Sequence, residues 1–150
     1  VEDLSTRNGA KGSNWGLVKA DLRAADDAAH AIRVTRKYWA MAQFSRYIRP
    51  GDRLLAVDDL DTVGALSPDG SRLVLVHVNP GLNPRMLLPP AGWRGSMVVT
   101  DATHNATCVA GMTAPARSVA TLVLHRGNPP SLPCRRAGVS TVTEDRDFAP

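Results

Sequence analysis

The spacing of hydrophobic residues changes at the Pro50-Gly51 pair. Before it, apolar residues recur three to four positions apart over 35–48, the spacing of one face of an amphipathic helix. Thr35 can cap the first turn of this helix, and Pro50-Gly51 ends it. The stripe consists of Val34, Tyr38, Met41 and Ile48, and Trp39, Phe44 and Tyr47 widen it. The pattern predicts one helix that packs against a sizeable surface.

After Gly51 the apolar residues form short runs separated by Gly and Pro. The expected strands are 53–57, 62–66, 72–79, 96–100 and 118–124. Ser67-Pro68-Asp69-Gly70 is a strong turn signal, because Pro68 fits the first central position and Gly70 the left-handed one. It joins 62–66 and 72–79 into a hairpin. The predicted fold class is therefore mainly β, an antiparallel β-sandwich preceded by one amphipathic helix.

Four other segments carry little periodic pattern. Residues 1–20 are rich in turn formers and are expected to be loop, and 24–30 to form a loose helical turn. The Pro-rich segment 80–95 is also expected to be loop. From 127 to 150 the chain gains Pro, Arg and Ser, which favours a tail that is mostly disordered or a linker.

Composition and charge limit the classes of function and partner that are expected for this chain. The chain has 150 residues, 43% hydrophobic and 21% charged, which is ordinary globular usage. The net charge is +4, but the arginines are scattered instead of forming one stripe, so no nucleic-acid partner is expected. No apolar run is long enough to cross a bilayer, and no membrane partner is expected. The first residues are not a signal peptide and include no Met, which indicates a mature product or a fragment.

The cysteines and one short motif leave alternatives open. Cys108 and Cys134 are too few for a disulfide scaffold. They can form one bridge in an oxidising compartment, or Cys108 can be a buried thiol. Asn105-Ala106-Thr107 matches the N-glycosylation pattern, which matters only for a chain secreted by a eukaryote.

Candidate metal and catalytic residues are sparse. His30, His77, His104 and His125 have no metal-ligand spacing to one another, and His77 is interpreted as a satisfied strand residue. Asp58, Asp59 and Asp61 form either a solvated turn or a Ca²⁺ cluster, and the turn is favoured. No phosphate-binding loop or nucleophile elbow is present. We therefore expect no cofactor and no metal.

Trp15 is the best candidate for contact with a ligand. It lies between Asn14 and Gly16 in a polar segment. Its ring can stack on the apolar face of a sugar while Asn14 binds hydroxyl groups. The alternative is a Trp that anchors the segment to the core, which the local sequence favours.

The order of several motifs resembles glycoside hydrolase family 30, with endo-β-1,6-galactanase-like members the nearest match. Arg36–Gly51 resembles the run that leads from the last helix of a (β/α)8 barrel into a β-sandwich. Leu66–Val76 is similar to the first sandwich hairpin of the family, and Ala114–Leu124 to its closing strand. Asn14–Val18 resembles the loop after the last barrel strand. The resemblance covers residues 14–125.

The resemblance implies a secreted retaining glycosidase that acts on β-1,6-galactan or a related polysaccharide. Such enzymes use two carboxyl groups about 5–5.5 Å apart. The only glutamates here, Glu2 and Glu144, do not match the catalytic motif positions, so no catalytic residue is assigned and it stays open whether this chain is an enzyme. Asn14 and Trp15 are the expected substrate-binding residues.

The resemblance also predicts a domain division. Residues 1–50 would be a remnant of the last loop and helix of the barrel, 51–126 the β-sandwich and 127–150 the tail. The expected partners are the missing barrel domain and, through the complete enzyme, the polysaccharide. The leading hypothesis is a C-terminal segment that supports the barrel and is inactive alone. The alternatives are a free-standing carbohydrate-binding β-sandwich and a gene-model remnant without independent function.

Overall fold

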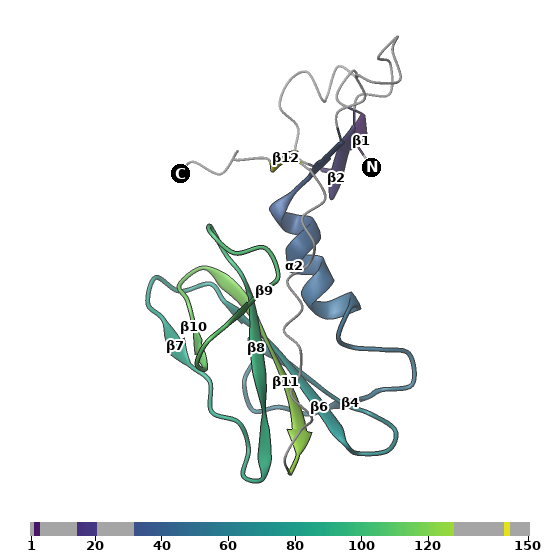
Figure 1. The fold of residues 1–150 in the computed structure, drawn as a ribbon, viewed down its shortest axis with the longest axis vertical. Coiled ribbons are helices and arrows are strands. Elements are labelled where there is room, and N and C mark those ends of the chain that lie inside the picture. Colours follow the sequence, from purple (N-terminus) through teal and green to yellow (C-terminus); the bar gives the residue numbers. More distant parts are fainter. Residues whose placement is uncertain (1, 4–14, 21–31, 128–142, 145–150) are drawn as a thin grey trace. The chain divides into compact units, whose positions relative to one another are not determined.

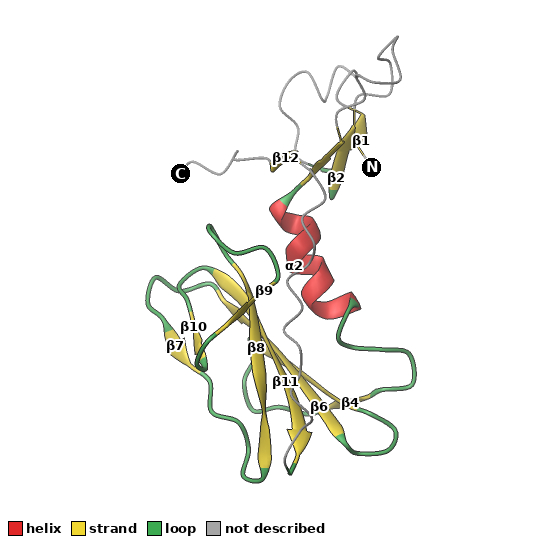
Figure 2. Cartoon of the chain, viewed as in Figure 1, coloured by secondary structure: helices red, strands yellow, loops and turns green. Residues whose placement is uncertain are grey.

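The structure is a computed structural model that describes residues 2–3, 15–20, 32–127 and 143–144 (Figure 1). The chain divides into two compact units, residues 1–38 with 139–150 and residues 39–138. Within the described residues the structure is mainly β, with one helix and antiparallel pairing in the larger sheet (Figure 2). The predicted fold class is confirmed.

The larger unit is built on a six-stranded antiparallel sheet with the order β4-β5-β6-β11-β8-β9. Its strands are β4 (Arg53–Leu55), β5 (Thr62–Leu66), β6 (Arg72–Asn79), β8 (Trp93–Thr100), β9 (Thr107–Val109) and β11 (Ser118–Arg126). The expected hairpin is present as β5 and β6, joined through Ser67–Gly70. All five strands predicted after Gly51 exist. The strands 62–66 and 72–79 have the predicted bounds, and the other three have shifted ends.

One face of this sheet carries the main hydrophobic core. Leu122 of β11 lies in register with Leu75 of β6 and Met97 of β8, so the centre of the core spans three strands. The ribbon of β7 (Arg85–Met86) and β10 (Thr113–Ala114) contributes the fully buried Ala114. The buried cluster consists of Leu73, Met97, Val99, Ala114, Ala120, Leu122 and Leu124.

The second face contacts the helix. Thr100 follows the core residue Val99 on β8, so its side chain points to the opposite face. Helix α2 (Arg36–Ser45) places the fully buried Gln43 there, and its Nε2 donates to Thr100 Oγ1 at 2.9 Å. The helix is thus anchored to the sheet by a buried polar contact.

Several local expectations need correction. The segment 80–95 is not all loop, since it contains β7 and the start of β8, and a two-residue strand is too short to show a period. Residues 1–20, expected to be loop, contain β1 (Glu2–Asp3) and β2 (Val18–Ala20). The Thr35 hydroxyl, expected to cap the helix, donates to Leu17 O at 2.8 Å, so this proton ties the helix start to the residue before β2.

The smaller unit contains a four-stranded sheet with the order β1-β2-β3-β12. β3 (Ile32–Val34) pairs antiparallel with β2, whereas β1 and β12 (Thr143–Glu144) pair parallel on either side. β12 lies within the tail expected to be mostly disordered or a linker. The expected turn at 24–30 and residues 128–142 lie outside the described residues.

Candidate functional site

The predicted sugar-contact residue Trp15 has an exposed side chain. Its relative exposure is 85%, and it lies three residues before β2. Asn14, the other predicted contact residue, lies outside the described residues. An exposed indole can stack on a ring-shaped ligand. Stacking on a sugar stays a prediction for this residue.

The two glutamates lie on opposite outer strands of the small sheet. Glu2 is on β1 and Glu144 is on β12, and β2 and β3 separate these strands. Adjacent strands are about 4.8 Å apart, so three spacings place the two backbones roughly 14 Å apart. A retaining glycosidase needs its two carboxyl groups at about 5–5.5 Å. The backbone arrangement of these two residues therefore offers no support for that role.

A buried histidine occupies the centre of a polar cluster in the larger unit. His77 on β6 is 1% exposed, and its Nδ1 lies 2.9 Å from Thr62 Oγ1. The Thr62 hydroxyl donates to Asp59 Oδ2 at 3.0 Å, so its oxygen is left to accept from His77 Nδ1–H. His77 Nε2 has no hydrogen-bond partner. Burial, with a smaller contribution from the nearby Arg85, lowers the pKa of His77 and favours the neutral imidazole.

Asp59 links this cluster to the ribbon. Its carboxylate accepts from the backbone N of Asp61 at 3.1 Å and pairs with Arg85 at 3.0 Å. These contacts, with the hydroxyl of Thr62, lower the pKa of Asp59, and the bond from Asp61 N has the largest effect. The carboxylate is occupied by the protein's own donors, as in a hydrogen-bonded turn. No cluster of three or more metal-ligating side chains occurs within the described part of the chain.

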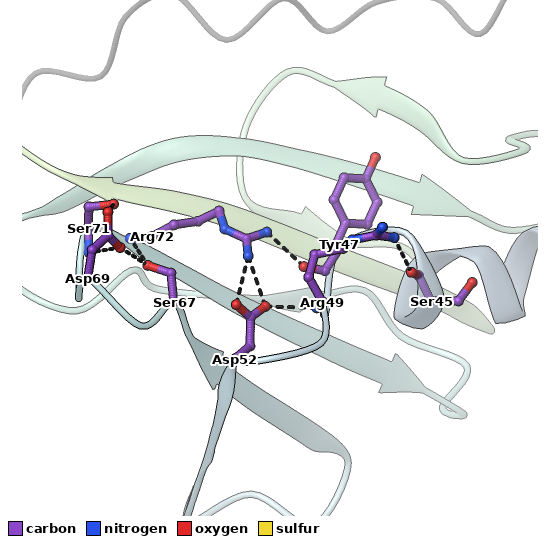
Figure 3. A network of polar contacts seen from close by, with 8 residues as sticks. All are labelled: Ser45, Tyr47, Arg49, Asp52, Ser67, Asp69, Ser71 and Arg72. Atoms are coloured by element: carbon purple, nitrogen blue, oxygen red, sulfur yellow. Dashed lines mark hydrogen bonds and ion pairs between the residues drawn. The ribbon is translucent and has the colours of Figure 1, made fainter.

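A second network joins the end of the helix to the hairpin (Figure 3). Arg72 donates from Nη1 to Tyr47 O at 2.8 Å and from Nη2 to both oxygens of Asp52 at 2.9 Å. Asp52 also accepts from Arg49 N, and Arg49 Nη1 donates to Ser45 O at the last turn of the helix. The sequence analysis did not predict the Arg72–Asp52 pair. The residues are 20 positions apart, and no local pattern links them.

The connection between β8 and β9 is held by Asp101. Its carboxylate accepts from the backbone N atoms of Thr103 and His104 and lies 2.9 Å from His104 Nδ1. Burial raises the pKa of Asp101, but these hydrogen bonds outweigh it and the net shift is downward. Further along, Cys108 is part of a disulfide. Cys134 lies outside the described residues.

Comparison with known proteins identifies relatives of this fold. No protein-family profile matches the sequence. The sequence is 33% identical over 70 residues to an endo-beta-1,6-galactanase from Hypocrea rufa, a match that covers 47% of this chain and 14% of that protein. The chain thus spans about a seventh of that relative.

Two solved structures share the fold. A conserved exported protein from Bacteroides fragilis matches with a TM-score of 0.57 and 21% identity, over 71% of this chain and 26% of that one. The catalytic domain of GH30 xylanase C from Talaromyces cellulolyticus matches with a TM-score of 0.55 and 24% identity, over 73% of this chain and 27% of that one. This fold thus also occurs within the catalytic domain of a GH30 xylanase. The resemblance to family 30 glycoside hydrolases is confirmed, for a part of such proteins.

Proposed function

We propose that this chain is the β-domain portion of a family 30 glycoside hydrolase that acts on β-1,6-galactan or a related polysaccharide. Its role is to support the barrel domain, and it does not hydrolyse glycans alone. The observation that carries this proposal is the fixed joint between helix and sheet, where Arg72 binds both Tyr47 O and Asp52. These contacts fix the orientation of the helix end relative to the sheet. A domain that supports a barrel requires such a fixed orientation.

The relative's name supports the substrate class, because the sequence matches part of an endo-beta-1,6-galactanase. The absence of a matched catalytic pair among the two glutamates supports inactivity of the chain alone. We also propose secretion. The disulfide at Cys108 supports it, since disulfides persist in oxidising compartments. Among the described residues, no helix has the length and apolar character needed to span a membrane.

A chimera tests the supporting role. Residues 14–125 of this chain, which the family resemblance covers, replace the corresponding segment of the Hypocrea rufa relative, and release of reducing sugar from β-1,6-galactan is measured. We expect the chimera to retain activity and the isolated 150-residue chain to release no sugar. Product release by the isolated chain would overturn the inactivity, and a folded but inactive chimera would overturn the supporting role.

A free-standing carbohydrate-binding module is the second candidate, favoured by the exposed Trp15. Affinity electrophoresis of the isolated chain in gels that contain β-1,6-galactan distinguishes the binding module from the supporting domain. Retarded migration without hydrolysis supports the binding module. Unretarded migration together with an active chimera supports the structural role.

A further inference from the structure

The sequence Asn105-Ala106-Thr107 lies at the end of the connection between β8 and β9. Thr107 is exposed and is the first residue of β9, where it pairs with Val99 of β8. Ala106 has a φ of 49° and its backbone N donates to Thr100 Oγ1 at 3.0 Å. Asn105 therefore sits in a turn directly before an edge strand, outside the paired part of the sheet.

Residues close to Asn105 in the chain are exposed to solvent. Ala102 and Thr103 in the same connection are exposed, and Asn105 itself is half-buried. β9 is the last strand of the six-stranded sheet, so within the described structure it pairs only with β8. A bulky hydrophilic adduct at such a loop displaces no core residue, and a surface loop is where N-linked glycans are carried.

A second, independent observation concerns the compartment. Cys108, three residues after Asn105, is part of a disulfide. Disulfides form and persist in oxidising environments such as the lumen of the endoplasmic reticulum, where asparagine residues are also glycosylated. The inference rests on the secretion proposed above and, in addition, requires a eukaryotic pathway that attaches N-glycans. It does not depend on the proposed support of a barrel.

We infer that Asn105 is an N-glycosylation site. Its side-chain Nδ2 forms a bond to the anomeric carbon of an oligosaccharide carried on a lipid pyrophosphate. The bond from that carbon to the pyrophosphate oxygen breaks, the lipid pyrophosphate leaves, and the amide nitrogen loses one proton. Thr107 provides the hydroxyl residue that the acceptor pattern requires at its third position.

The test is expression of the full chain behind a cleavable secretion leader in yeast. Intact mass is measured before and after an amidase that releases N-glycans and converts the modified Asn to Asp. Both the secreted and the cell-retained pools are analysed, because the glycan is added before folding is checked. Peptide mass spectrometry then locates the site.

We expect one glycan, at Asn105, which is lost in Asn105→Gln and in Thr107→Ala and kept in Thr107→Ser. The Ser variant is the matched control, because it keeps the hydroxyl that the pattern needs. An unmodified Asn105 in both pools of the wild-type chain would overturn the inference. A glycan at Asn105 that survives Thr107→Ala would also overturn it, because the site would then not depend on the pattern.

Discussion

At the scale of single residues, Arg72 and Asp52 decide how the helix meets the sheet. The Asp52 side chain is 2% exposed and that of Arg72 25%, so the pair is largely shielded from water. Shielding strengthens a charged hydrogen bond, but it also makes an unpaired charge costly. The pair thus stabilises the joint only while both partners are present.

Asp52→Asn should therefore destabilise the larger unit. The change leaves Arg72 without its counter-charge and weakens the acceptor for Arg49 N. We expect the free energy of unfolding to fall by about 2 kcal/mol, measured by urea denaturation. Asp58→Asn is the matched control, because Asp58 is exposed and its loss should change stability by less than about 0.5 kcal/mol. Equal effects of the two changes would contradict the role given to the pair.

The stability that the hairpin turn contributes should depend on pH through Asp69. Hydrogen bonds from the Ser67 hydroxyl, the Ser71 hydroxyl and Ser71 N lower the pKa of Asp69 from 3.8 to about 2. A carboxyl with a lowered folded-state pKa stabilises the fold above its unfolded pKa, and this stabilisation is lost as pH falls through the folded pKa. The wild-type chain should thus lose stability relative to Asp69→Asn as pH falls from about 5 to 2. If the urea midpoints of the wild-type chain and of Asp69→Asn changed in parallel over this range, the turn would not stabilise the charged form of Asp69.

At the scale of elements, the sequence predicted the helix and the strands β4, β5, β6, β8 and β11 from the spacing of their apolar residues. The short strands β7, β10 and β12 could not be predicted, since two residues show no period and their pairing is set by distant partners. The site residues divide in the same way. The local sequence singled out Trp15, whose contact with sugar stays a prediction, whereas the Arg72–Asp52 and Thr62–His77 contacts join residues far apart in the sequence and could not be predicted from a local pattern.

Gly95 on β8 is required by the pairing of β8 with β11. A Cβ atom at this position would overlap the carbonyl oxygen of Val123, a backbone atom that cannot turn aside. Gly95→Ala should therefore separate β8 from β11 and lower the free energy of unfolding by about 3 kcal/mol or more, measured in urea.

Gly111→Ala is the matched control, because Gly111 has a φ of 84° but open space around it. It should cost only the left-handed backbone strain, about 1–2 kcal/mol. If Gly95→Ala cost no more than the control, the close approach of β8 and β11 at Gly95 would be contradicted.

At the scale of the whole molecule, Trp15 is the residue through which the chain itself is expected to contact the glycan. Trp15→Ala removes the exposed indole while leaving the described core untouched, so stability should change by less than about 0.5 kcal/mol. If Trp15 stacks on sugar, the active chimera should lose about 1 kcal/mol of binding to β-1,6-galactan, seen as a raised KM. Trp15→Phe keeps a ring and should retain most of the affinity. Unchanged KM in Trp15→Ala would assign the tryptophan no part in substrate binding, and the chain would then serve the enzyme through its fold alone.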